Sequence, residues 1–138
     1  MATITLEMAQ IALAACLAKA AEISSPSSVA IIDDGRELVG FGRMDGALLA
    51  SAAISQAKAY TSRSLGCDTR DVDGLAQPGG ALFGIHTAHL AVGRALITFG
   101  GGVLVTMDGE PVGAIGVAGG SPDQDHEIAA AGAAALGA

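Results

Sequence analysis

The chain has 138 residues, a length that fits one domain, so we expect residues 1–138 to form a single domain. Hydrophobic residues make up 51% of the chain and charged residues 15%, a balance that excludes intrinsic disorder. The net charge of −7 repels phosphate backbones, and one Tyr and three Phe offer little base stacking. We therefore expect no nucleic-acid partner.

The sequence also indicates the cellular compartment of the protein and whether it has a metal-binding site. No apolar run is long enough to span a membrane, and the N-terminus has no basic region followed by an apolar stretch. Cys16 and Cys67 form neither a CxxC pair nor a metal-binding spacing, which is typical of reduced thiols. His86 and His89 are three residues apart but have no acid beside them. We expect a cytoplasmic protein with no membrane partner and no metal site.

Very small residues are abundant, with 29 Ala and 20 Gly in the chain. Each such side chain buries little area, so contacts between copies become an important further source of buried surface. The composition thus favours a homo-oligomer.

The first half of the chain predicts a helix at 5–22, with Thr5 as its N-cap. A β-branched run predicts a strand at 29–32, and Asp33-Asp34-Gly35 predicts a hairpin turn in which Asp-Gly supplies a positive φ. The return strand is predicted at 37–42. A second helix is predicted at 47–65, closed by Gly66.

The second half begins with residues 67–99, whose signals are mixed and leave their structure open. Strands are predicted at 103–106 and 112–117, joined at Asp108-Gly109. Ser121, Pro122 and Gln124 predict the start of a last helix, which reaches about residue 136. Two hairpins among helices predict an α+β fold with an antiparallel sheet.

A polar stripe runs along the predicted helix at 47–65, with members spaced i, i+4, i+7 and i+11: Ser51, Ser55, Lys58 and Ser62. One interpretation is a donor-rich pocket wall for an anionic or oxygen-rich ligand, anchored by the charge of Lys58. Lys58→Ala would then weaken binding and leave the fold intact. The other interpretation is a solvated face on which Lys58 pairs with Asp45 or with an acid near the C-terminus.

Two further groups are candidates for the site. Arg43 and Asp45 lie between a strand and a helix, where they could hold a ligand at a pocket mouth, or Asp45 could simply stabilise the first helical turn. Asp125, His126 and Glu127 lie in the first turns of the last helix. Asp125 shares a face with apolar residues and should point inward, where a carboxylate suits acid–base work. The alternative is that these acids only complement the helix dipole.

Ordered motifs extend over most of the chain, namely AIIDDGRELV at 30–39, RMDGA at 43–47, AKA at 57–59, GGV at 101–103, DGEPVGAIGVAGG at 108–120 and DQD at 123–125. With this set the chain resembles the GlcG/HbpS-like family, which also occurs as the C-terminal domain of PduO-type proteins. Residues 67–99 match the family least.

The resemblance implies a profilin-like fold, with an antiparallel sheet of about five strands flanked by helices, and assembly into oligomers. Some family members bind haem through a histidine of the first helix. This chain has no histidine before His86, so haem is a candidate cofactor that would need another ligand.

Two functions remain open, and a third interpretation is a structural oligomer with no ligand. The first is a small-molecule-binding protein whose ligand is a tetrapyrrole or a small organic acid, held by Arg43, Asp45, Lys58 and the serines of the stripe. The second is a small isomerase or lyase that moves a proton on a small oxygenated substrate. In that enzyme Lys58 would bind the anion, and Asp125, His126 or Glu127 would move the proton.

Overall fold

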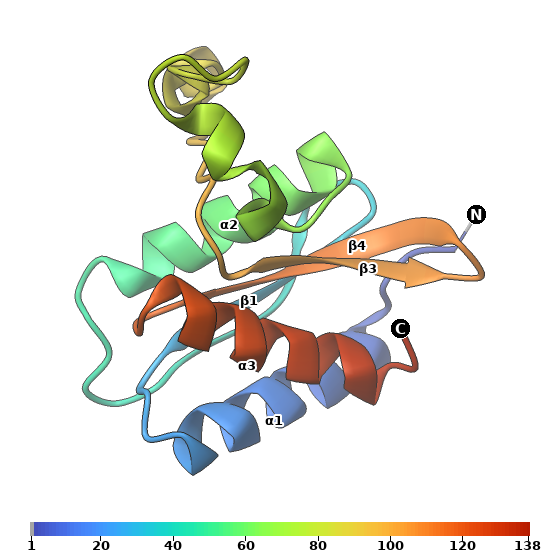
Figure 1. The fold of residues 1–138 in the computed structure, drawn as a ribbon. Coiled ribbons are helices and arrows are strands. Elements are labelled where there is room, and N and C mark those ends of the chain that lie inside the picture. Colours follow the sequence, from blue (N-terminus) through green and yellow to red (C-terminus); the bar gives the residue numbers. More distant parts are fainter. Residues whose placement is uncertain (1) are drawn as a thin grey trace.

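The structure is a computed structural model that describes residues 2–138. Its sheet has four antiparallel strands in the order β2-β1-β4-β3, and helices cover both faces of this sheet (Figure 1). The elements are α1 (Leu6–Glu22), β1 (Ser28–Asp33), β2 (Leu38–Arg43), α2 (Ser51–Leu65), β3 (Gly102–Met107), β4 (Glu110–Ala118) and α3 (Pro122–Ala135).

The two faces of the sheet build two unequal cores. Val29 and Ile31 of β1 join the larger core, together with buried residues of α1 and α3. The alternate residues Ala30 and Ile32 join a smaller core with Ala59 of α2. This alternation is the period of two that a strand imposes on its side chains. Consequently α2 lies alone on one face, and α1 and α3 lie side by side on the other (Figure 1).

Small residues bring the backbone of α2 very close to the sheet. A Cβ at Gly116 of β4 would collide with the main-chain carbonyl oxygen of Ser55. Ala59 and Ala114 fill the same interface and are fully buried. The high Ala and Gly content therefore serves close packing within one chain.

The predicted helix boundaries hold at most positions. Thr5 caps α1 by accepting a hydrogen bond from the Met8 amide, and Ser121 and Gln124 form a capping box at the start of α3. Gly66 ends α2 with a φ of 73°.

Three expectations need correction. The sheet has four strands rather than about five, because residues 67–99 add no strand. Helix α2 begins at Ser51 rather than at residue 47, because the Ala47 amide is used in a turn that closes onto the Met44 carbonyl. In the first hairpin the left-handed residue is Arg36, with a φ of 70°, rather than the glycine before it.

The least predictable segment, residues 67–99, projects beyond α2 and is called the arm below (Figure 1). It contains four short 3-10 turns: Thr69–Val72, Gly74–Ala76, Ile85–Thr87 and Leu90–Val92. At its base, the Thr69 hydroxyl donates to the Phe99 carbonyl at 2.7 Å and accepts from the Gly102 amide at 2.9 Å. The two ends of the arm are therefore joined beside β3.

Candidate functional site

The polar stripe of α2 faces the sheet. Each of its four side chains is at most 1% exposed. The serine hydroxyls have protein partners, with Ser51 bonded to Ser28, Ser55 donating to the Ala52 carbonyl and Ser62 donating to the Cys67 carbonyl. The stripe is thus neither the wall of an open pocket nor a solvated face, because the small residues opposite it leave no space between helix and sheet.

Lys58 and Asp125 form a buried ion pair. The Lys58 Nζ donates to the Asp125 Oδ2 and to the Val117 carbonyl, each at 2.9 Å. The other carboxylate oxygen, Asp125 Oδ1, accepts from the Gly120 amide at 2.9 Å. The expectation that Asp125 points inward is confirmed, since the residue is 2% exposed. Lys58 pairs with an acid near the C-terminus, as the second interpretation of the sequence proposed, but the pair is buried and does not lie on a solvated face.

This ion pair connects the two helical layers, because Lys58 comes from α2 and Asp125 from α3 on the opposite face (Figure 1). The lysine passes the start of β3 at Gly101, where a Cβ would lie only 2.6 Å from Nζ. The Phe99 ring lies over the ammonium, 4.9 Å from Nζ to the ring centroid. Gly101 therefore provides space that the buried lysine side chain needs.

Burial sets the electrostatics of the pair. Loss of hydration lowers the pKa of the Lys58 ammonium, and the Asp125 carboxylate offsets part of that shift. Both charges are enclosed by protein and satisfied by it. The arrangement is that of a structural ion pair, and a ligand has no access to either charge.

Arg43 and Asp45 lie elsewhere, on the surface. They line an open hollow of about 350 Å³ together with Met44 and Gly46. Both side chains are exposed, and Asp45 precedes the first residue of α2 by more than a helical turn. Asp45 is therefore not an acid of the first turn of α2. The structure does not bring Arg43 or Asp45 into the surroundings of Lys58.

The consecutive residues Asp125, His126 and Glu127 have three different surroundings. Glu127 is exposed and pairs with Lys19 of α1 at 3.4 Å. His126 is half-buried, and within residues 2–138 its Nδ1 has no hydrogen-bond partner. Burial, followed by the Arg70 cation, lowers the pKa of His126. The candidate proton-transfer groups therefore do not converge on one point.

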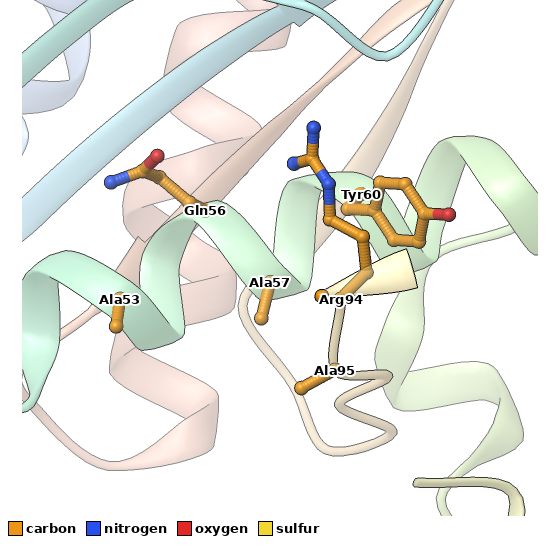
Figure 2. A pocket seen from close by; sticks show the side chains of 7 residues that line it. Ala53, Gln56, Ala57, Tyr60, Arg94 and Ala95 are labelled. Carbon is orange, nitrogen blue, oxygen red and sulfur yellow. The ribbon is translucent and has the colours of Figure 1, made fainter. Parts of the chain in front are cut away.

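A different pocket opens beside α2, against the end of the arm (Figure 2). It has a volume of about 300 Å³. One wall is a face of α2 next to the buried stripe, and the other is the backbone and side chains of residues 93–95. The lining residues are Ala53, Gln56, Ala57, Tyr60, Gly93, Arg94 and Ala95.

Tyr60 organises the cationic side of this region. Its ring lies beneath two guanidinium groups, with Cζ of Arg36 at 4.8 Å and Cζ of Arg94 at 5.0 Å from the centroid. Its hydroxyl accepts from the Arg36 guanidinium at 3.2 Å and is hydrogen-bonded to His89 Nδ1 at 3.0 Å. Arg94 and His89 belong to the arm, so Tyr60 also holds the arm against α2.

Arg94 is exposed, and among residues 2–138 its guanidinium forms no ion pair and donates no hydrogen bond. By contrast, Arg63 is neutralised by Asp34 at 2.8 Å. A second hollow of about 260 Å³ adjoins the pocket and shares Tyr60 and Arg94 with it.

Sequence reasoning missed this pocket. Two signals were available: Tyr60 is the only tyrosine, and Arg94 is one of two basic residues in the arm. Within residues 2–138, no cluster of three or more His, Cys, Asp or Glu side chains is placed to hold a metal ion. In the same residues, no helix combines the length and apolar character needed to cross a bilayer.

A model of the family described as haem degrading protein HbpS-like matches residues 4–134. The chain belongs to the HbpS-like family. The resemblance expected from the ordered motifs is thereby confirmed. An uncharacterised 15.0 kDa protein from the dhaT-dhaS intergenic region of Citrobacter freundii is 38% identical over 128 residues, which cover 93% of this chain and 88% of that protein.

Two solved structures share the fold over nearly the whole chain. The Klebsiella pneumoniae protein ORFY aligns with a TM-score of 0.91 and 34% identity, covering 100% of this chain and 93% of that one. A PduOC:heme complex aligns with a TM-score of 0.88 and 30% identity, covering 96% and 94% of the two chains.

Proposed function

We propose that this member of the HbpS-like family is a single-domain protein that binds an anionic, oxygen-rich small molecule, either a tetrapyrrole or a small organic acid. The observation that carries the proposal is the guanidinium of Arg94 at the edge of the α2 pocket, which has no ion pair or hydrogen bond among residues 2–138. In a protein of net charge −7, a cation without a partner beside a hollow favours an anionic ligand. The haem complex of a related chain supports a small-molecule role.

The residues of this chain show how well it could ligate haem. Helix α1 holds no histidine, and burial raises the pKa of its Cys16 to about 12, so that thiol is not an available thiolate ligand. His86 and His89 each use one ring nitrogen, for Thr98 and Tyr60 respectively. The residues of this chain do not fit haem ligation from α1, although Arg36 and Arg94 suit carboxylates.

Native mass spectrometry of gently purified protein tests the proposal. We expect a non-covalent adduct that is lost on denaturation, and a raised melting temperature with the released compound or with related acids. A titration with haem is the parallel experiment, in which we expect no sharp Soret band at one-to-one stoichiometry. If no adduct appears and neither haem nor organic acids stabilise the protein, the proposal is wrong.

We also propose that the protein self-associates. Leu6 and Ile11 of α1 are 60% and 47% exposed, and Leu49 before α2 is 91% exposed. Burying such side chains between copies is favourable. Light scattering should give a multiple of 13.5 kDa, and a mass of 13.5 kDa at micromolar concentration would contradict self-association.

A further inference from the structure

The α2 pocket combines two kinds of surface. Its apolar part includes three methyl groups, from Ala53 and Ala57 one turn apart on α2 and from Ala95 on the facing segment (Figure 2). Its polar part consists of the Gln56 amide and the Arg94 guanidinium. These two groups come from different segments and extend toward the same side of α2 (Figure 2).

The polar groups are available as donors. Among residues 2–138 the Arg94 guanidinium makes no hydrogen bond or ion pair, so its five N–H groups can serve a ligand. Gln56 uses one N–H on the Ala52 carbonyl, at 3.3 Å, and keeps a second. The Tyr60 ring fixes Arg94 from below through the cation–π contact at 5.0 Å. Tyr60 is thus a positioning residue for the guanidinium.

The charge of the lining also selects the ligand. None of the seven lining residues is acidic, so an anion in the pocket meets no like charge from its walls. A guanidinium matches a carboxylate with two parallel N–H···O bonds. The pocket volume of about 300 Å³ lies at the lower limit of typical ligand pockets, and three of its lining residues are alanines with short methyl side chains.

We propose that this pocket binds short aliphatic carboxylates. The carboxylate accepts hydrogen bonds from Arg94 and Gln56, and the hydrocarbon chain lies over the three alanines. This inference rests on the proposed function and narrows its ligand to a small organic acid. The inference predicts that a ligand needs only a carboxylate charge and a short hydrocarbon chain to be recognised at this pocket.

The probe for the test is hexanoate, with the uncharged hexanamide as its isosteric control, titrated at low salt into the full chain labelled with 15N. We expect saturable shifts of the amide signals of residues 53–57 and 93–95 with hexanoate. Hexanamide should bind at least about tenfold more weakly, because it lacks the charge that strengthens the hydrogen bonds.

Two variants make the test specific. Arg94→Ala should raise the dissociation constant of hexanoate at least about tenfold, and Arg94→Lys should restore binding only in part, because an ammonium lacks the forked donor geometry. Arg70→Ala removes another exposed arginine of the arm and should leave binding unchanged. Melting temperatures of all variants confirm that each is folded.

The inference is overturned if hexanamide binds as well as hexanoate, if Arg94→Ala binds normally, or if the shifts map outside the pocket. It is also overturned if hexanoate does not bind while native mass spectrometry finds another ligand. That last result would leave the proposed binding function standing, so the two failures are distinguishable.

Discussion

Two cationic side chains lie on different sides of α2 and meet opposite surroundings. Lys58 is 1% exposed, and an acid and a carbonyl hold its ammonium. Arg94 is exposed and has the Tyr60 ring beneath it, and among residues 2–138 it has no ion pair or hydrogen bond from its guanidinium. The lysine donates two of its three N–H groups within the fold, whereas the arginine donates none to a partner among residues 2–138. A cation in a family motif is therefore a poor guide to a binding site until its partners are known.

The largest expected effect comes from breaking the buried pair. Lys58→Ala should lower the free energy of unfolding by about 3–5 kcal/mol, because Asp125 is left buried without a counter-charge. Urea denaturation measures this loss. Arg94→Ala removes the exposed cation and serves as the control. It should lower the free energy of unfolding by less than about 1 kcal/mol.

A second variant separates loss of charge from loss of packing. Lys58→Met combined with Asp125→Leu removes both charges and should cost less than Lys58→Ala alone. If Lys58→Ala instead costs under about 1 kcal/mol and abolishes ligand binding, Lys58 is part of a ligand site, as the sequence first suggested.

The next effect concerns the glycine beside the pair. Gly101 has a φ of 128°, and a Cβ there would lie 2.5 Å from the Val117 carbonyl oxygen and 2.6 Å from the Lys58 ammonium. Gly101→Ala should therefore cost at least about 2 kcal/mol in thermal or chemical unfolding. Gly79 also has a positive φ, of 87°, but a Cβ there has open space around it. Gly79→Ala should lower the free energy of unfolding by only about 1 kcal/mol. Equal losses in the two variants would show that Val117 and Lys58 both tolerate the added methyl group.

A third experiment measures how the stability of the protein depends on pH through a buried thiol. Burial raises the pKa of Cys16 from 9.0 to about 12, so between these values the unfolded chain loses a proton that the folded chain keeps. The contribution of the protonated Cys16 thiol to the free energy of unfolding is thus fully present below pH 9. It is lost as pH rises toward 12, by up to about 1.4 kcal/mol for each pH unit. Cys16→Ala should remove this slope from denaturation curves. An identical slope in both proteins would contradict the shift.

The smallest effect should come from the phenol at the pocket. Tyr60→Phe removes the hydrogen bonds to Arg36 and His89 and keeps the ring under Arg94. We expect a loss of about 0.5–1.5 kcal/mol in unfolding free energy, with hexanoate affinity nearly unchanged in calorimetry. Tyr60→Leu removes the ring as well and should weaken hexanoate binding. Equal binding by both variants would show that the ring does not position Arg94.

The parts of the fold that follow from short-range signals could be predicted. Caps at Thr5, Ser121 and Gly66 and the β-branched run of β1 fix local structure without help from distant residues. The start of α2 could not be predicted, because the turn at Met44–Ala47 depends on where Ala47 is buried. The arm carries no periodic pattern, and its position depends on distant contacts such as that of His89 with Tyr60.

The candidate site was harder to predict because helical spacing does not reveal which face is covered. The stripe of Ser51, Ser55, Lys58 and Ser62 has the polarity of an exposed or ligand-binding face, yet it packs on the sheet. The adjacent face, with Ala53, Gln56, Ala57 and Tyr60, has weaker polarity and borders the pocket. Its cationic partner lies 34 positions beyond Tyr60, in the segment with the least regular pattern.

The connection between Lys58 and Asp125 also determines how the molecule can open. Helices α2 and α3 cover opposite faces of the sheet, and neither can separate from it without parting two buried charges. Local opening of one layer alone therefore already breaks the ion pair, and opening the second layer does not break it again. We expect the amide protons of α2 and α3 to exchange through one cooperative unfolding event, and those of the arm to exchange earlier and independently.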